Sequence, residues 1–189
     1  TVAPGVIALA VMSTAFTSLA IATGFDRRSG ALRLLGTTPL SRGNLLLARA
    51  LSVAVIEIIQ IALILATAAA LGWRPEGSPL PAVVLVILGT AAFAAWAFVL
   101  AGALRAEATL AVANGIYLVL MLAGGVVIPA SSLPSGWATV VNLLPSGALA
   151  SGLRDVFDPG ATMPWAAAAV LVVWAGVGFV VASRTFRWD

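Results

Sequence analysis

The stretch DRRSGALRLLGTTPLSR, residues 26–42, decides how this chain folds. It carries four arginines and separates two apolar runs, residues 2–24 and 45–72. Each run exceeds the roughly 20 residues that a helix needs to cross a bilayer. A charged segment between two such runs has to lie at a membrane surface, because charged side chains are costly within the hydrocarbon. The chain is therefore predicted to cross a membrane, turn at residues 26–42 and cross back.

The composition of the whole chain is that of an integral membrane protein. Hydrophobic residues make up 61% of the 189 residues and charged residues only 9%, whereas about a quarter of the residues in soluble domains are charged. The long apolar runs lack the strict alternation of apolar and polar residues that a β-barrel needs. We therefore predict an all-α, polytopic helical membrane protein with a single transmembrane domain over residues 1–189. Its predicted spans are residues 2–24, 45–72, 81–104, 109–129 and 163–183.

The arginines predict the orientation of these spans. Cytoplasmic loops of membrane proteins carry an excess of basic residues, and five spans place the two termini on opposite sides. One side receives only Arg74 and Arg154. We therefore expect the other side, with the C-terminus, to be cytoplasmic in a multi-pass protein of a bacterial plasma (inner) membrane. The arginines of that side are Arg27, Arg28, Arg33, Arg42, Arg105, Arg184 and Arg187.

The residue types that the chain lacks exclude several kinds of chemistry. Without Cys and His there can be no Cys/His zinc site, no haem held by either residue, no Ser-His-Asp triad and no thiol nucleophile. All ten basic residues are Arg, and the phosphate-binding loop GxxxxGK followed by Ser or Thr requires a lysine. We expect this chain to be no enzyme and to bind no metal and no cofactor itself.

The basic character of the chain does not point to nucleic acid. The sequence pI is 11.1, but the net charge is only +3. The arginines follow the predicted cytoplasmic loops, where attraction to anionic lipid headgroups explains them. We expect membrane lipid, and no nucleic acid, among the partners.

Polar residues interrupt two of the predicted spans. At 1.5 Å per residue Glu57 lies near the middle of the bilayer, where an acid facing lipid costs roughly 2.5 to 3.5 kcal/mol. Glu57, with Gln60 one turn on, should therefore face protein or a wet cavity. Glu57 is either part of a substrate or proton pathway or the partner of a structural hydrogen bond. Asn114 and Tyr117, in the fourth run, belong either to a pathway wall or to ordinary helix packing.

Residues 130–160 fit neither a loop nor a span. The segment 136–152 is fairly apolar, but Pro145 interrupts it, so one helix cannot comfortably cross about 30 Å of hydrocarbon here. Two short helices that dip into the outer leaflet and bury their backbone against protein would fit. Such a re-entrant segment is a candidate outer gate, and a cap on the membrane surface is the alternative. The gate candidates are Pro134, Trp137, Pro145 and Arg154.

Within the charged stretch, residues 26–35 have the pattern of a short interfacial helix. Gly36 and Pro39 are suited to end it. On these residues alone, the helix is either a docking element for a soluble partner or a basic anchor at the membrane surface. Its apolar face would consist of Leu32, Leu34 and Leu35, and its basic face of Arg27, Arg28 and Arg33.

Two groups of residues resemble the permeases of type-2 ABC exporters. In the charged stretch the matching residues are Asp26-Arg27, Gly30, Leu32-Arg33-Leu34-Leu35 and Thr38-Pro39-Leu40. The family more often has Glu at the position of Asp26. Before the last span the matching residues are Pro129, Leu133-Pro134, Trp137, Leu144-Pro145 and Leu153-Arg154. The two matches occur in the expected order and together cover nearly the whole chain.

The resemblance implies an architecture and a set of partners. Permeases of this family have six spans, so the first run here would correspond to the second span, and we expect further sequence before Thr1. Two permease subunits, identical or different, surround a central path, and each docks a separate ATPase that binds ATP and Mg. Docking uses a cytoplasmic coupling helix. Its residues here would be Asp26, Arg27, Arg28, Gly30, Leu32, Arg33, Leu34, Leu35, Thr38 and Pro39.

The expected function is that of the membrane-spanning subunit of an ATP-driven ABC exporter. Such a subunit would move an amphipathic or hydrophobic substrate outward, drug-like as in multidrug efflux or lipid-like. The alternative is a non-transporting scaffold or sensor that recruits a cytoplasmic partner through its basic helix. Co-purification of an ATPase subunit, followed by a transport assay, would discriminate between the two.

Overall fold

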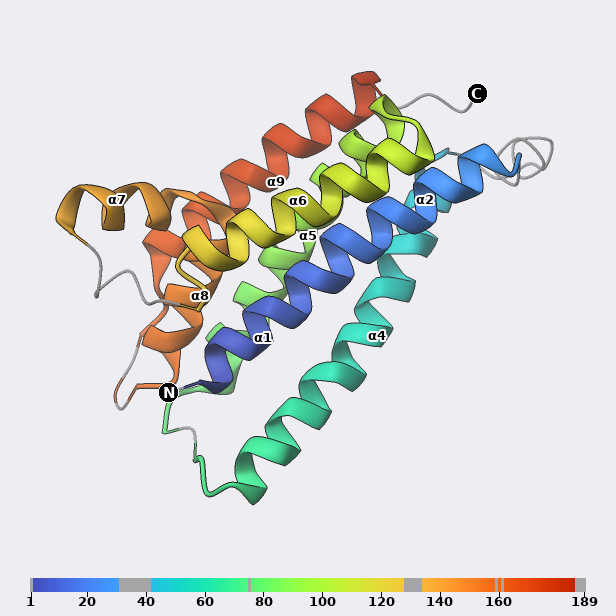
Figure 1. Ribbon diagram of the computed structural model, residues 1–189. Coiled ribbons are helices and arrows are strands. Elements are labelled where there is room, and N and C mark those ends of the chain that lie inside the picture. The colour runs from blue at the N-terminus through green and yellow to red at the C-terminus, as the bar shows by residue number, and fades with distance from the viewer. Residues whose placement is uncertain are drawn as a thin grey trace.

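The computed structural model describes residues 2–30, 42–74, 76–127, 134–158, 160 and 162–185. Within these ranges the chain forms helices and no strands, as predicted (Figure 1). Five helices are long and apolar enough to cross a membrane, also as predicted. They comprise residues Ala3–Arg28, Leu47–Ala70, Pro79–Ala103, Ala106–Ala123 and Trp165–Thr185.

The first span is a continuous helix whose middle part is π-helical. It consists of α1 (Ala3–Val11), η1 (Met12–Ser18) and α2 (Leu19–Arg28). At the end of η1, the backbone N–H of Leu19 bonds the carbonyl of Thr14, five residues back. π-Helical segments are rare and occur frequently at functional sites. The surroundings of η1 are therefore a first place to look for one.

The first span continues beyond residue 24, where it was predicted to end, and includes Asp26, Arg27 and Arg28. It then ends at a turn in which Gly30 has a φ of +77°, a conformation that glycine adopts without steric cost. This corrects the predicted helix over residues 26–35, because residues 26–28 are the last turn of the span. The remainder of that predicted helix, residues 31–35, lies outside the described residues.

The other four spans are α4 (Arg42–Ala70), α5 (Pro79–Ala103), α6 (Ala106–Ala123) and α9 (Trp165–Thr185). Most of their bounds lie within about three residues of the prediction. The exception is α6, which ends at Ala123 instead of residue 129. A glycine pair follows it, and the second of the pair, Gly125, has a φ of +76°.

The centre of the bundle is α5. It packs against η1, α2, α8 and α9, and its contact surface is built from small residues such as Gly89, Ala92, Ala97 and Ala101. Small side chains let helix backbones approach closely in a membrane, where packing rather than the hydrophobic effect holds helices together.

The second span, α4, lies at the edge of the bundle. It contacts α1, η1 and α5, and Figure 1 shows it beside the first span, on the side of the bundle away from α9. The opposite side of α4 exposes large apolar side chains, including Leu51, Val55, Ile58 and Ile59. Such a surface is suited to lipid.

Between α6 and α9 the chain forms two short helices, α7 (Ser135–Leu143) and α8 (Pro145–Val156). The 12 residues of α8 extend about 18 Å, too short to cross a bilayer. Even so, α8 packs against α1, α5 and α9 and fully buries Leu149 and Leu153. The face of α8 that carries these two leucines therefore packs against the helix bundle.

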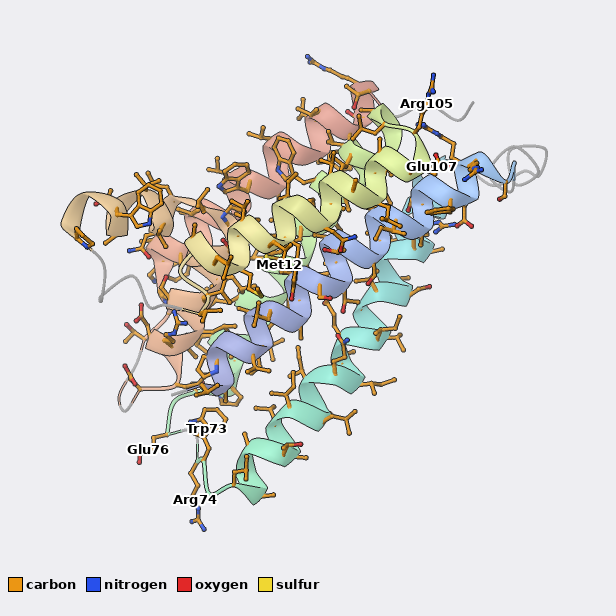
Figure 2. All side chains as sticks on the ribbon, in the orientation of Figure 1. Met12, Trp73, Arg74, Glu76, Arg105 and Glu107 are labelled. Carbon is orange, nitrogen blue, oxygen red and sulfur yellow. The ribbon has the colours of Figure 1, made fainter. Side chains whose placement is uncertain are left out.

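The two ends of the bundle differ in charge. Arg27, Arg28, Arg105 and Arg184 lie at one end, which we call the basic end. Figure 2 shows Arg105 and Glu107 there, with Trp73, Arg74 and Glu76 at the far end of the molecule, which we call the opposite end. Arg154, in α8, also lies toward the opposite end. This division of the arginines is the one on which the predicted orientation rests.

Candidate functional site

Four polar side chains from three helices meet where η1, α4 and α5 come together. Thr14 Oγ1 in η1 donates a hydrogen bond of 2.7 Å to Gln60 Oε1 in α4. Thr90 Oγ1 in α5 lies 2.5 Å from Glu57 Oε2 in α4. Glu57 is only 3% exposed, so it faces protein as the sequence predicted. We call these four residues the intramembrane polar cluster.

Glu57 is poorly satisfied within this cluster. The Thr90 hydroxyl carries one proton and also lies 2.9 Å from the carbonyl oxygen of Val86. Among the described residues, Glu57 Oε2 therefore shares its one hydrogen-bond donor with the Val86 carbonyl. Glu57 Oε1 is buried and makes no hydrogen bond among the described residues. A buried polar atom without a partner is costly, and such atoms in native structures call for an explanation.

A second unsatisfied oxygen lies at the same depth. The Thr14–Gln60 bond sets the antiparallel register between the first span and α4. Thr17 is three residues after Thr14, and Glu57 is three residues before Gln60. Because the two helices run antiparallel, Thr17 lies level with Glu57. Thr17 Oγ1 is also buried and without a hydrogen bond among the described residues. Two buried side chains at this level of the bundle therefore each have one oxygen without a hydrogen-bond partner among the described residues.

An apolar groove opens between α1 and the last two turns of α4, toward the opposite end of the bundle. Its volume is about 330 Å³. None of the four residues of the intramembrane polar cluster is among the residues that line it. We call this the α1–α4 groove. Its lining residues are Val2, Ala3, Val6, Leu63, Ile64, Thr67, Ala68 and Leu71.

Only part of the predicted pathway set comes together. Glu57 and Gln60 share one helix face, but Asn114 and Tyr117 lie on α6, which packs against η1, α2 and α5. Asn114 is exposed and bonds the carbonyl of Leu110 in its own helix at 2.9 Å. The structure therefore does not bring Asn114 and Tyr117 to the helix face that carries Glu57 and Gln60. The sequence analysis missed Thr14 and Thr90, because single hydroxyls are common in apolar helices and only tertiary contacts distinguish these two.

The basic end holds a second group of polar contacts. Arg27 donates from Nη1 to the carbonyl of Gly102 at 2.7 Å and from Nη2 to the carbonyl of Leu104 at 2.6 Å. These carbonyls lie at the end of α5, where a helix has no backbone donors left for them. Arg27 therefore caps α5 from the neighbouring first span.

The residues on either side of Arg27 pair with two other helices. Asp26 forms an ion pair with Arg49 in α4, and Arg28 forms one with Glu107 in α6. The Arg28–Glu107 pair is exposed, and such pairs contribute about 0 to 1 kcal/mol. The three residues thus connect the end of the first span to α4, α5 and α6. Of the other predicted coupling residues only Gly30 is described; Leu32, Arg33, Leu34, Leu35, Thr38 and Pro39 lie outside the described residues.

At the opposite end Arg154 also binds two backbone carbonyls, those of residues that follow α6. Its Nη1 and Nη2 donate to the carbonyls of Gly125 and Val126 at 2.9 and 2.5 Å. Burial lowers the pKa of Arg154, and the neighbouring Asp155 opposes this. For Asp155, burial raises the pKa, the charge of Asp158 adds to the increase and Arg154 counteracts it.

The four predicted gate residues separate into two pairs. Pro145 is buried at the start of α8, and Arg154 is partly buried in the same helix. Pro134 and Trp137 are exposed, with Trp137 in α7. The structure therefore does not bring all four together at one constriction.

The described residues contain no group of three or more His, Cys, Asp or Glu that could hold a metal ion. The comparisons with known proteins return neither a curated protein nor a solved structure that matches. The family described as ABC-2 family transporter protein does match, over residues 1–184. That match spans nearly the whole chain and includes both ends of the bundle, so the chain belongs to the ABC-2 transporter family and is a membrane subunit of such a transporter.

Proposed function

We propose that this permease is the membrane-spanning subunit of an ATP-driven exporter that moves amphipathic or hydrophobic substrates outward. Energy would come from a separate ATP-binding cassette subunit that binds ATP and Mg at the basic end, which we place in the cytoplasm. A second permease subunit, identical or different, would complete the transporter. Family membership implies the ATPase partner.

The observation that carries this proposal is the set of contacts made by residues 26–28. They immediately precede the charged loop, and their side chains reach α4, α5 and α6. A force on the loop would therefore act on four spans at once, counting the first. That is what a transporter needs if an ATPase outside the membrane is to rearrange helices inside it.

The contacts also change the role expected for these charges. Asp26 and Arg27 were predicted to belong to the coupling helix that docks the ATPase, but both are engaged by helices of their own chain. We therefore propose that residues 26–28 act as a rigid connection within the permease. The loop that follows them would then contact the ATPase.

Replacing Arg27 by Ala tests this connection. The variant should assemble with the ATPase but lose most of its substrate-stimulated ATP hydrolysis, because α5 is no longer tied to the first span. If the tie contributes about 1.4 kcal/mol to coupling, stimulation should fall about tenfold. The measurement is ATP hydrolysis and substrate uptake by the reconstituted complex in inside-out vesicles.

Arg105→Ala is the matched control, since Arg105 is an exposed arginine at the same end. It should leave coupling unchanged. Normal coupling in Arg27→Ala would overturn the proposed connection. A stable complex with the ATPase that shows no nucleotide-driven transport at all would instead indicate the scaffold or sensor.

A further inference from the structure

We propose that Glu57 is a proton-binding site: its carboxyl group is protonated at neutral pH, and the bound proton forms the hydrogen bond that ties α4 to α5. This inference goes beyond the proposed export function and does not depend on it, because it concerns how the permease holds its own second span. It can therefore be tested on the permease alone, without the ATPase or a substrate.

The first step is the number of protons at Thr90. Thr90 Oγ1 in α5 lies 2.5 Å from Glu57 Oε2 and 2.9 Å from the carbonyl oxygen of Val86. The hydroxyl carries one proton, and one well-formed hydrogen bond uses it. A protonated Glu57 supplies the second proton: its O–H donates to Thr90 Oγ1, and the Thr90 O–H donates to the Val86 carbonyl. Both contacts are then complete hydrogen bonds.

The second step is the cost of a negative charge at this position. Glu57 is 3% exposed, and α4 packs against α1, η1 and α5, none of which contains an ionisable side chain. In α2 the ionisable side chains lie only in the last turn. On α4 itself the nearest is Arg49, more than two turns away and paired with Asp26. A buried carboxylate without a cation is so unfavourable that such a group takes up a proton instead.

The third step is the other carboxyl oxygen. Glu57 Oε1 is buried and has no hydrogen-bond partner among the described residues. In a carboxylate this oxygen would carry part of the negative charge, and leaving a charged group without donors costs more than leaving a neutral one. In the neutral acid it is a carbonyl oxygen. The unpartnered Oε1 therefore fits the protonated form better than the ionised form.

The proton has a consequence for the position of α4. Of the five spans, α4 has the smallest buried share, so it is held to the bundle over little surface. An ionised Glu57 would regain hydration only by leaving its buried position beside Thr90. We therefore expect α4 to move away from α5 when a high pH removes the proton.

The first test is infrared spectroscopy of the intact chain in nanodiscs of phosphatidylcholine. The C=O stretching band of a protonated carboxyl group is separate from the bands of carboxylates and shifts in D₂O. Wild type should show this band at neutral pH, and Glu57→Gln should lose it. Asp155→Asn is the control for another acid, because burial raises the pKa of Asp155, and this variant should retain the band of Glu57.

Thr90→Val provides a second measurement, which also covers the case in which Glu57→Gln fails to fold. It removes the acceptor of the Glu57 proton, so the carboxyl band should move to higher frequency. Thr67→Val is the matched control, because Thr67 is an exposed threonine of α4 that donates to the carbonyl of Leu63 in its own helix at 2.8 Å. The band should be unchanged in that variant.

The second test measures the distance between α4 and α5. Because the sequence contains no cysteine, Val55→Cys and Ile87→Cys can carry a pair of spin labels at side chains that are 58% and 61% exposed. Raising the pH should increase the distance between the labels when Glu57 is present. In the Glu57→Gln background the distance should not change, since the amide donates to Thr90 at every pH.

Three results would overturn the inference. The first is a spectrum without a protonated-carboxyl band that depends on Glu57, and the second is a band that Thr90→Val leaves in place. The third is a distance between the labels that responds to pH equally with Glu57 and with Gln at this position. None of these measurements involves ATP-driven export, so the proposed function would stand or fall separately.

Discussion

Two arginines of this chain hold helix ends that belong to other elements. Arg27 in the first span binds the carbonyls at the end of α5, and Arg154 in α8 binds the carbonyls that follow α6. The planar guanidinium suits both sites, because two of its N–H groups can reach two neighbouring carbonyls at once. The Arg27 contact satisfies carbonyls that the end of α5 leaves without partners, whereas the Arg154 contact satisfies carbonyls of the segment that follows α6.

Arg154→Lys should therefore destabilise the protein although the charge is kept. A lysine presents one ammonium on a flexible stem and cannot reproduce the two-armed contact. Loss of one hydrogen bond to a charged group costs about 1.5 to 3 kcal/mol, so Tm should fall by several degrees in a thermal melt followed by circular dichroism. Arg74→Lys, an exposed arginine near the same end, is the control and should melt like wild type. Equal Tm values for all three proteins would contradict this role of Arg154.

At the scale of elements, α5 and α9 form the most extensive helix pair of the bundle. The Nε1 of Trp96 in α5 donates to the carbonyl of Trp174 in α9 at 3.1 Å, and the two rings meet edge to face with centroids 5.5 Å apart. Gly178 lets α9 approach this surface. A Cβ added at Gly178 would lie 2.9 Å from side-chain atoms of Ala95 and Trp96.

Two glycines of α9 provide a matched pair of substitutions for this interface. Gly178→Ala should force α5 and α9 apart, because the anchored Trp96 ring cannot easily yield, and overpacking of this kind typically costs about 1 to 3 kcal/mol. Gly176→Ala meets no atom within 4 Å and should be neutral or slightly stabilising, since alanine is the better helix former. Thermal melts of both variants measure the difference. If Gly178→Ala proved as stable as Gly176→Ala, close packing at this glycine would be refuted.

At the scale of the whole molecule, the bundle is tied at both ends and open along one side. Residues 26–28 connect four spans at the basic end, and α8 packs between α1, α5 and α9 toward the opposite end. On the open side α4 packs against α1, η1 and α5, and the α1–α4 groove lies between α4 and α1 (Figure 1). Of the five spans, α4 is the one with the smallest buried share.

The orientation of this bundle can be tested directly because the sequence contains no cysteine. Arg74→Cys and Arg105→Cys introduce single thiols at exposed positions of the two ends. A membrane-impermeant maleimide added to intact cells should label the Arg74→Cys variant only. The Arg105→Cys variant should react only after permeabilisation. The reverse pattern would show that the basic end is not cytoplasmic.

Much of the architecture follows from local properties of the sequence. Five apolar runs of sufficient length predict five spanning helices, and Pro145 predicts that the segment before the last span is broken into two short helices. The inward orientation of Glu57 follows from the cost of an acid in lipid. The end of the first span was placed too early, because Asp26, Arg27 and Arg28 read as a separate surface helix, whereas contacts with α4, α5 and α6 continue the helix through them.

By itself the sequence determined the membrane class, the five spanning helices of the described residues and the charge difference between the two ends. These properties depend on composition and on the hydrophobicity of each continuous segment, and neither requires contacts with other segments. Only the tertiary structure decided that Thr14 meets Gln60, that Arg27 caps α5 and that Glu57 is left one shared donor. Those contacts join residues 33 to 77 positions apart. They therefore depend on how the helices are placed against one another, and packing between helices sets that placement.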